Sequence, residues 1–303
     1  MAKDVMEKRR FGKTDMHVSV LGFGGYEIGC SSASPEDIAR LLNTALDAGL
    51  NVLDTAACYK DSEMLIGNAV GHRRKDFFLF TKAGHASGLN FSDWDPSLVE
   101  ASIDRSLVRL KTDCVDLVQL HTCDRATLEK GDAFRAVERA RNAGKTRYIG
   151  YSGDGEAALY AVQSGLFDAL QTSISIADQE ALALTLPIAA EKHMGVIAKR
   201  PIANAVWRNS GVPKEAYHRP YFHRINELKY DFLNKALEES VGVALRFTLA
   251  APGVHTAIVG TENPERYAKN AALLKAGPLP AHECSAIRDR WNAVARPDWG
   301  GLS

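Results

Sequence analysis

Four side chains that could take part in proton transfer follow successive apolar runs of the sequence. Asp54 ends the run NVLD, Tyr59 comes five residues later, Lys82 follows FFLFT, and His121 follows VDLVQL. A tyrosine hydroxyl, with an ordinary pKa of about 10, is a poor acid or base at neutral pH, but a nearby ammonium favours the phenolate and lowers that pKa. An aspartate beside the lysine would hold the ammonium in place, and a histidine could donate a hydrogen bond to a polarised oxygen. Together the four residue types suit general-acid catalysis on a carbonyl oxygen.

Each of these residues has a more ordinary explanation when it is considered alone. An aspartate at a strand end is often a cap or turn residue, a tyrosine is often a partly buried aromatic, a lysine is usually solvated, and a histidine is often bonded to the backbone. The catalytic interpretation therefore depends on a fold that brings the four together. Cys58 and Cys123 lie nearby in the sequence. Neither a partnered base nor a recognisable ligand spacing accompanies them, so we expect neither a cysteine nucleophile nor a metal site.

Strand-like apolar runs alternate with helical patterns along the chain. Strands are expected at 18–22, 51–54, 77–80, 115–120, 146–151, 168–171, 196–198 and 256–259. Helices are expected at 35–48, 62–70, 96–110, 126–143, 156–163, 179–192, 231–250, 264–274 and 279–294. The alternation predicts an α/β fold, a (β/α)8 TIM barrel, formed by residues 1–303 as a single domain. Because the carboxyl ends of barrel strands converge on one face, we expect the four residues to meet there.

Two segments lie outside this alternation. Residues 1–16 suggest a short N-terminal hairpin ending near Gly12, and residues 202–230 form a long loop rich in aromatic and histidine residues. A loop of that length is more often a lid or a binding loop than a connector. An open doubly wound sheet is the alternative fold. It would need a G-x-G-x-x-G fingerprint after its first strand, and the sequence GFGGYEIG does not match that pattern.

The composition excludes several classes of partner. The chain has 303 residues, 37 of them basic and 37 acidic, and this balance argues against a nucleic-acid or anionic-membrane surface. No apolar run approaches the roughly 20 residues of a membrane span. Five cysteines without a CxxC pair suit a reducing compartment. We therefore expect a cytoplasmic protein with neither nucleic acid nor membrane as a partner, and the four residues point to a small-molecule carbonyl. No sequence pattern indicates an oligomeric state.

Several motifs of the chain resemble those of one enzyme family. The segments NVLDTAACY, FLFTKAG, LVQLHTCD, GKTRYIGYS and ALRFTLAAPGVHTAIVGTENPERYAKN are similar to blocks of the aldo-keto reductases, and the resemblance runs essentially end to end. It implies a barrel that binds a nicotinamide cofactor across its C-terminal face, NADP(H) or possibly NAD(H). Tyr59 would be the proton donor, Lys82 paired with Asp54 would lower its pKa, and His121 would orient the carbonyl.

The resemblance also implies a set of cofactor-binding residues. Gly24, Gly25 and Tyr26 would lie near the nicotinamide, and Ser152 and Gln171 would hold its carboxamide. The remaining implied contacts are Gly260, Thr261 and Asn263 with the phosphates, Arg266 with the 2′-phosphate, Asn270 with the adenine, and Lys199 and Arg200 after GVIA. Three positions depart from the family pattern. Gly153 replaces the usual Asn, Lys199 stands where many members have a stacking aromatic, and Gly260 stands where some have Lys.

The leading hypothesis is an NAD(P)H-dependent oxidoreductase that reduces an aldehyde or ketone. The polar and aromatic loop 202–230 suggests an alternative, NAD-linked oxidation of a sugar-like or polyol alcohol. A second alternative is a non-catalytic dinucleotide-binding subunit, which Lys199 suggests.

Overall fold

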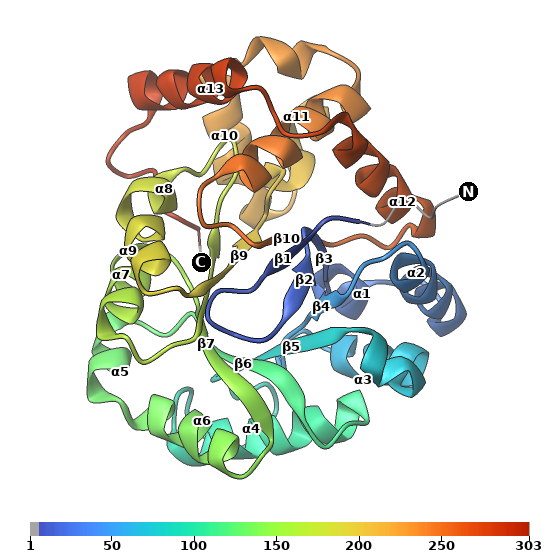
Figure 1. Ribbon diagram of the computed structural model, residues 1–303, viewed down its shortest axis with the longest axis vertical. Coiled ribbons are helices and arrows are strands. Elements are labelled where there is room, and N and C mark those ends of the chain that lie inside the picture. Colours follow the sequence, from blue (N-terminus) through green and yellow to red (C-terminus); the bar gives the residue numbers. More distant parts are fainter. Residues whose placement is uncertain (1–5, 303) are drawn as a thin grey trace.

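The computed structural model describes residues 6–302, and its centre is a closed barrel of parallel strands (Figure 1). Around the barrel the strand order is β10-β3-β4-β5-β6-β7-β8-β9. The strands are β3 (Leu21–Gly24), β4 (Val52–Asp54), β5 (Phe78–Ala83), β6 (Val115–His121), β7 (Thr146–Ser152), β8 (Ala169–Ser173), β9 (Gly195–Lys199) and β10 (Thr256–Val259). The closed parallel barrel with helices between its strands confirms the predicted (β/α)8 fold and rules out the open sheet.

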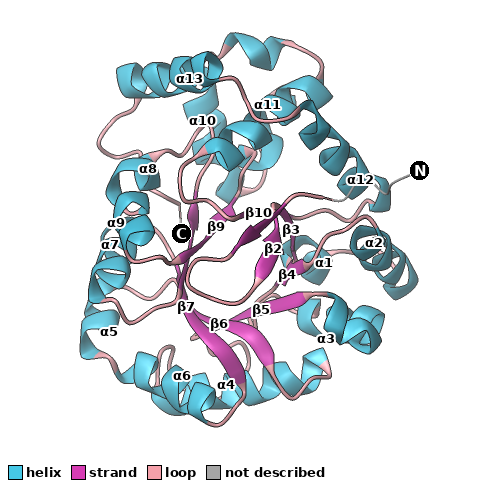
Figure 2. Ribbon diagram, in the orientation of Figure 1, coloured by secondary structure: helices cyan, strands magenta, loops and turns pink. Residues whose placement is uncertain are grey.

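Helices surround this barrel (Figure 2). They are α1 (Tyr26–Cys30), α2 (Pro35–Asp47), α3 (Ser62–Val70), α4 (Pro96–Leu110), α5 (Arg125–Lys130), α6 (Asp132–Asn142), α7 (Gly155–Ser164), α8 (Glu180–Leu184), α9 (Leu186–Glu191), α10 (Arg219–Leu228), α11 (Leu237–Ala250), α12 (Pro264–Leu273) and α13 (Ala281–Val294). Short 3-10 turns are η1 (Gly71–Asp76), η2 (Ala203–Arg208), η3 (Ala216–His218), η4 (Asp231–Asn234) and η5 (Leu274–Ala276). Within residues 6–302, no helix combines the length and apolar character that a membrane crossing requires.

Local sequence explains where the best-predicted helices begin. Ser34 accepts a hydrogen bond from the backbone N–H of Asp37 at the start of α2, and Pro35 occupies its first turn. Asp95 caps α4 in the same way, by accepting from the N–H groups of Ser97 and Leu98. These caps satisfy amide groups that have no partner inside the helix.

An antiparallel hairpin, β1 (Lys8–Arg10) with β2 (His17–Ser19), closes one end of the barrel. Phe11 and Val18 are fully buried there, and the Phe11 ring stacks on Phe80 with the centroids 5.7 Å apart. The first barrel strand predicted at 18–22 is therefore wrong in its start, because Val18 belongs to the hairpin and the barrel strand begins at Leu21. Gly12 lies in the turn of the hairpin and not at its end. The second strand, β2, follows this turn and carries the buried Val18.

Several other expectations need correction. The helix expected at 179–192 is two helices, α8 and α9, that meet at Thr185. The helix expected at 231–250 begins only at Leu237, because residues 231–234 form the turn η4. The helix expected at 126–143 is two helices, α5 and α6, because Gly131 adopts a left-handed conformation with φ 76° between them. The long loop at 202–230 contains α10, whose Tyr221, Ile225 and Leu228 bury one face at helical spacing. The strand expected at 77–80 extends to Ala83 because residues 80–83 pair with β6. Lys82, predicted just past the strand end, consequently lies within the strand.

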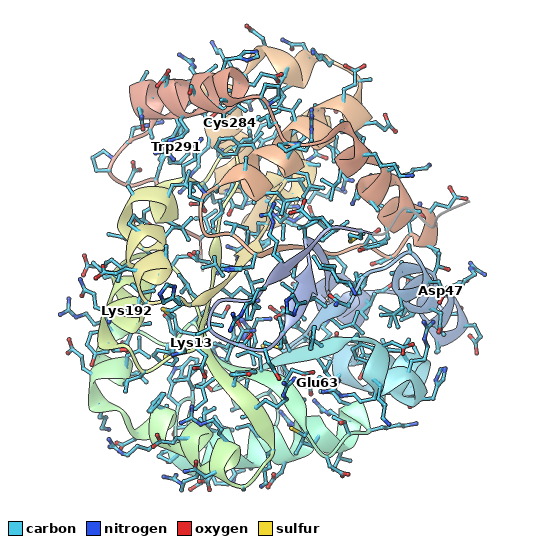
Figure 3. The ribbon with its side chains drawn as sticks, viewed as in Figure 1. Lys13, Asp47, Glu63, Lys192, Cys284 and Trp291 are labelled. Carbon is cyan, nitrogen blue, oxygen red and sulfur yellow. The ribbon has the colours of Figure 1, made fainter. Side chains whose placement is uncertain are left out.

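The segment 202–230 packs with the last helices as a second apolar cluster beside the barrel. This second cluster includes Tyr221, Leu228, Phe247, Trp291 and Trp299. Trp291 and its neighbour Cys284 both project from α13, at the top of the view in Figure 3. The cluster places the segment and the C-terminal residues on the β8–β9 side of the barrel.

Candidate active site

Inward-pointing positions change from apolar to polar along five of the barrel strands. Successive side chains of a strand alternate between its faces, so residues two apart share the interior. The apolar layer nearest the hairpin is followed two residues later by a polar layer, in the pairs Val52 and Asp54, Phe80 and Lys82, Leu117 and Gln119, Ala169 and Gln171, and Ile197 and Lys199. The polar layer faces the carboxyl ends of the strands, where barrel sites form.

The four predicted catalytic residues come together in this polar layer and directly above it. The Lys82 ammonium forms a buried ion pair with Asp54 and donates a hydrogen bond to the carbonyl oxygen of Thr55, at 2.8 Å. It lies 5.1 Å from the centroid of the Tyr59 ring. That ring lies edge-on to His121 at a centroid distance of 5.6 Å. Strands β4, β5 and β6 and the loop after β4 thus supply one continuous cluster.

A chain of side-chain hydrogen bonds holds Asp54 from the far side of the barrel. Its Oδ2 accepts from Gln119 Nε2 at 3.0 Å and from Gln171 Nε2 at 2.8 Å. Ser152 Oγ in turn donates to Gln171 Oε1 at 3.1 Å. Ser152 and Gln171, to which the resemblance assigns the carboxamide, are therefore part of the network that orients Asp54. Gln119 is not among the predicted site residues, although its position two residues before His121 on β6 could have indicated it.

The electrostatics of the cluster differ from expectation in one respect. The pKa of Tyr59 was expected to fall beside Lys82, but burial and then the charge of Asp54 raise it well above its usual value. Burial, and then the Lys82 and His85 charges, lower the pKa of His121 well below its usual value. At neutral pH the site therefore presents a protonated phenol and a neutral imidazole. The phenol can donate a proton, and the imidazole can donate one hydrogen bond.

Aromatic rings extend from this cluster in both directions as a continuous row. His85 contacts His121 at 5.3 Å, and Trp94 contacts His85 at 4.8 Å between ring centroids. On the other side Tyr26 contacts Tyr59 at 5.2 Å, and Tyr217 lies 6.5 Å from Tyr26. Tyr26, expected in a loop, begins α1, and Tyr217 comes from η3 in the segment 202–230. The row forms an aromatic lining for the site.

Lys199 turns into the barrel and forms a second buried ion pair. Its Nζ lies 2.7 Å from Asp154 Oδ2, and Asp154 also accepts from Thr172 Oγ1 at 2.8 Å and from the Ser173 N–H at 2.7 Å. Burial lowers the pKa of Lys199. Burial alone would raise the pKa of Asp154, but Lys199 and the hydrogen bonds lower it overall. Where many family members have an aromatic ring that stacks on the nicotinamide, this chain therefore has a lysine that forms a buried ion pair.

Arg200 lies at the mouth of the site with its guanidinium 4.6 Å from the centroid of Tyr217. It donates to the Tyr217 hydroxyl and, at 2.9 Å, to Ser173 Oγ. Its backbone is left-handed, with φ 55°, which turns the side chain out of the strand direction that Lys199 follows. Arg200 and Tyr217 thus place a cation and a ring at the rim above the Lys199 pair.

Two glycines that depart from the family pattern sit where a side chain would collide. A Cβ at Gly153 would strike the hydroxyl and ring of Tyr151, whose hydroxyl donates to the carbonyl of Cys123 at 2.7 Å. A Cβ at Gly260 would strike the carboxylate of Glu27 from α1. The Tyr151 ring, held by its hydrogen bond, leaves no room for a side chain at Gly153, whereas the Glu27 carboxylate ends a flexible side chain that could move away from one at Gly260.

The residues expected to contact the phosphates surround the N-terminus of α12. Asn263 caps this helix by accepting from the Glu265 N–H at 2.9 Å, and Thr261 Oγ1 accepts from the Asn263 N–H at 3.1 Å. Arg266 lies half-buried in the first turn, and Asn270 is buried one turn later. An α-helix N-terminus with an arginine in its first turn is suited to an anionic group. Gly24 of β3 approaches the backbone of Gly260.

A further feature follows β9 and escaped the sequence analysis. Ala203, Asn204 and Ala205 all have left-handed backbones, with φ between 44° and 54°. The side-chain nitrogen of Asn204 is buried and has no hydrogen-bond partner among residues 6–302. Consecutive strained residues and an unpaired buried donor often mark a ligand site. Both features fit a polar ligand such as a dinucleotide.

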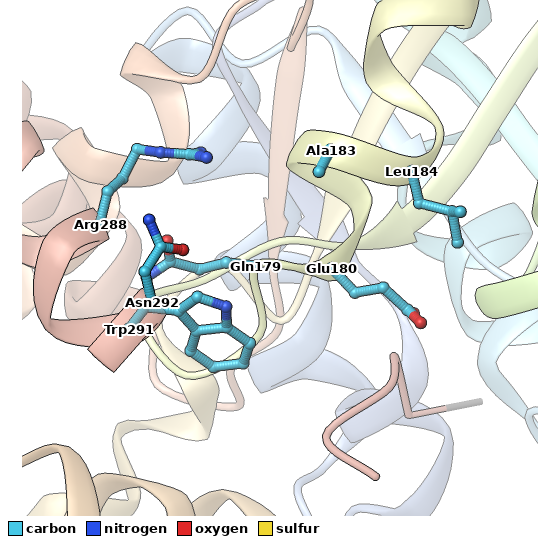
Figure 4. Close-up of a pocket in the computed structure, with 7 residues that line it drawn as sticks. All are labelled: Gln179, Glu180, Ala183, Leu184, Arg288, Trp291 and Asn292. Carbon is cyan, nitrogen blue, oxygen red and sulfur yellow. The ribbon is translucent and has the colours of Figure 1, made fainter. Parts of the chain in front are cut away.

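A separate pocket lies on the outer side of the barrel between α8 and α13 (Figure 4). It is lined by Gln179, Glu180, Ala183, Leu184, Arg288, Trp291 and Asn292. None of the four predicted catalytic residues lines it, so we do not assign a reaction to this pocket.

Comparison with known proteins agrees with this geometry. A sequence profile described as the aldo/keto reductase family matches residues 20–292. An uncharacterized oxidoreductase of Bacillus subtilis, YqkF, is 29% identical and covers 93% of this chain and 96% of its own. The L-galactose dehydrogenase of Arabidopsis thaliana is 26% identical over 89% of this chain and 88% of its own.

Solved structures give the same result. The holo form of the aldo-keto reductase AKR11C1 from Bacillus halodurans superposes with a TM-score of 0.83 at 26% identity, covering 97% of this chain and 99% of the other. A putative aldo-keto reductase from Pseudomonas aeruginosa gives a TM-score of 0.69 at 26% identity, over 89% of this chain and 96% of the other. The profile match, which spans most of the chain, together with this barrel and its cluster, shows that the protein is an oxidoreductase of the aldo-keto reductase family.

Proposed function

We propose that the protein reduces an aldehyde or ketone to an alcohol with NADP(H) as preferred cofactor and Tyr59 as proton donor. The observation that carries the proposal is the buried Lys82–Asp54 pair beneath the Tyr59 ring, with His121 beside it. A protonated phenol next to a neutral imidazole can bind and protonate a carbonyl oxygen.

The residues present fit a nicotinamide dinucleotide. The N-terminus of α12 with Arg266 suits phosphate groups, and the unpaired nitrogen of Asn204 suits a polar ligand beside β9. Arg266 supports NADP(H), because an arginine fork binds a phosphate with two parallel hydrogen bonds. When bound, the cofactor supplies the hydride that the carbonyl carbon accepts.

The chain's own residues would perform the remaining tasks. His121 would donate a hydrogen bond to the carbonyl oxygen and fix its position. Tyr59 would transfer its hydroxyl proton to the same oxygen as negative charge develops there. Lys82 would then stabilise the phenolate that remains, because its ammonium lies over the ring and Asp54 keeps it there. The aromatic row from Tyr26 to Trp94 would limit access of water to this step.

Oxidation of a sugar-like alcohol with NAD is the second candidate. A relative named L-galactose dehydrogenase favours it. In that direction the Tyr59 phenolate must accept a proton, and the raised pKa makes the phenolate rare at neutral pH. Alcohol oxidation should therefore accelerate steeply with pH. A non-catalytic subunit has less support, because the Lys199 departure involves Asp154 and none of the four catalytic residues.

The first test is a pair of titrations with NADPH and NADH, followed by a panel of aldehydes, ketones and polyols with the tighter cofactor. We expect tighter binding of NADPH and turnover on aldehydes or ketones at neutral pH. Tighter NADH binding, or turnover on polyols alone, would contradict the proposal and favour the second candidate.

The second test is Tyr59→Phe. Removal of the proton donor should lower kcat by roughly 10²–10⁴-fold while the Kd of the cofactor stays nearly unchanged. Tyr148→Phe is the matched control. It removes a tyrosine hydroxyl that bonds to Asp15 of the hairpin end, far from the site along the same barrel. Retained turnover in Tyr59→Phe would remove this residue from the acid role.

A further inference from the structure

Cys58 immediately precedes Tyr59 and contacts the catalytic histidine. Its Sγ lies 3.4 Å from Nδ1 of His121, a hydrogen-bonding distance for sulfur. None of the steps described above uses this thiol. The contact matters because the two nitrogens of a neutral imidazole are not equivalent. Only one of them carries the proton, and its partner decides which.

The direction of this hydrogen bond follows from the protonation states of the two groups. Burial raises the pKa of Cys58, so the thiol keeps its proton near neutral pH. The lowered pKa of His121 leaves its ring with one N–H and one bare nitrogen. An imidazole nitrogen is a strong acceptor, whereas thiol sulfur is a weak one, so S–H donation to Nδ1 is the better arrangement. The ring proton is then on Nε2.

The backbone around Cys58 holds the thiol in place. The N–H of Ala57 donates to the carbonyl of Lys82 at 3.1 Å, and the N–H of Tyr59 donates to Ala56 at 3.0 Å. The N–H of Ser62 in turn donates to the carbonyl of Tyr59 at 3.0 Å. These bonds tie the loop to β5 and α3 independently of the Cys58 side chain, so a substitution at Cys58 should leave the loop where it is.

We propose that Cys58 is a positioning residue that fixes the tautomer of His121 and thereby presents Nε2–H to the carbonyl oxygen. Without the thiol, the ring would divide between its two tautomers, and part of the protein would present a bare nitrogen that repels the oxygen. The expected loss of kcat/KM rests on the proposed function, because it assumes that His121 binds the carbonyl. The expected change in the tautomer of His121 does not rest on the proposed function.

Three variants test the proposal. Cys58→Val removes the donor at similar volume, and Cys58→Ser restores a donor at the same position. Cys114→Val is the control, because Cys114 is also half-buried but lies at the opposite end of β6, where its thiol contacts the Val115 carbonyl. The readouts are the ¹⁵N shifts of the His121 ring, assigned by comparison with His121→Gln, and kcat and KM on a carbonyl substrate.

We expect Nε2–H in the wild type, in Cys58→Ser and in the control, and a mixture of tautomers in Cys58→Val. The kcat/KM of Cys58→Val should fall by about 10-fold, with cofactor Kd unchanged and most of the loss recovered in Cys58→Ser. A wild-type ring spectrum in Cys58→Val would overturn the inference, as would equal losses in Val and Ser variants or a changed tautomer with unchanged kcat/KM. Inactivity of the wild type on every carbonyl would instead contradict the proposed function, and the ring spectra would remain interpretable.

Discussion

The same face of the barrel holds two buried lysine–aspartate pairs in different surroundings. Lys82 lies on β5 and Asp54 on β4, whereas Lys199 ends β9 and Asp154 comes just after the end of β7. Both aspartates accept further hydrogen bonds from side chains on other strands, and both lysines are buried. As charge pairs, the two are therefore alike in chemistry and burial.

Their surroundings make the difference. The Lys82 ammonium lies over the ring of Tyr59, so the first pair is placed to stabilise the phenolate that the proposed reaction would leave. The second pair has hydroxyl and backbone donors from Thr172 and Ser173 around it. The backbone of Gly301 from the C-terminal segment packs directly on Asp154. We therefore propose that the first pair is catalytic, because a group that could exchange a proton lies against it, and that the second pair fixes the ends of strands.

Lys82→Met should show the largest effect. Without the ammonium nothing stabilises the Tyr59 phenolate, and kcat for carbonyl reduction should fall by about 10³-fold. Lys199→Met, the same substitution in the other pair, is the control and should lose far less activity. Steady-state kinetics on both variants checks the comparison. Equal losses of kcat would show that the two pairs are not functionally distinct.

Lys199→Met should instead act on stability. Removal of the Lys199 ammonium leaves the Asp154 carboxylate buried without its lysine partner, and breaking a buried ion pair in this way typically costs about 3–5 kcal/mol of unfolding free energy. Urea denaturation followed by circular dichroism measures the loss. A second substitution, Asp154→Asn, should recover part of it because it removes the buried negative charge. An unchanged midpoint in Lys199→Met would contradict a structural role for the pair.

A third buried acid beside the second pair makes stability depend on pH. Burial, and then Asp154, raise the pKa of Asp178 to about 7, although Tyr221 donates to it at 3.1 Å and Arg224 lies 3.8 Å away. Since the folded protein binds this proton more tightly than the unfolded chain, the stabilisation is fully present below pH ~4 and is lost as pH rises through ~7. The loss is on the order of 4 kcal/mol.

Asp178→Asn should remove this pH dependence. The unfolding free energy of the wild type should fall between pH 5 and pH 8 as Asp178 ionises, and the variant lacks this loss. The difference in favour of the variant should therefore grow over this range by up to a few kcal/mol. Urea unfolding of both proteins at the two pH values is the measurement. If the difference between variant and wild type is the same at both pH values, Asp178 does not titrate in this range.

Tyr217→Phe should have the smallest effect. It keeps the ring over Arg200 but removes the hydroxyl that the guanidinium contacts. The loss of one hydrogen bond of about 1 kcal/mol should change KM for cofactor or carbonyl by up to fivefold and leave kcat nearly unchanged. Tyr160→Phe is the control, because Tyr160 also carries an arginine, Arg125, over its ring but lies on α7. A large fall in kcat would place Tyr217 in the chemistry.

The bounds of helices were predicted correctly where signals in the local sequence are enough to set them. The bounds of α3 and α4 were predicted without error, because the Asp95 cap and Pro96 mark the start of α4 and Gly71 follows the end of α3. Prediction failed where distant contacts decide the local structure. The apolar face of α10 is interrupted by histidine and arginine in sequence, and only burial against the second cluster reveals it. The sequence around Val18 suits a strand of either the barrel or the hairpin. Only the tertiary structure shows that Val18 pairs in the hairpin, which closes one end of the barrel.

The sequence alone determined the barrel and the four residues that meet at its carboxyl end, because apolar runs mark strand ends and closure of a parallel barrel brings those ends to one face. Only the tertiary structure decided which lysine faces Tyr59, that Cys58 meets His121, and that the pKa of Tyr59 rises. These properties depend on burial and on side chains contributed by distant strands. Neither the identity nor the spacing of the residues contains that information.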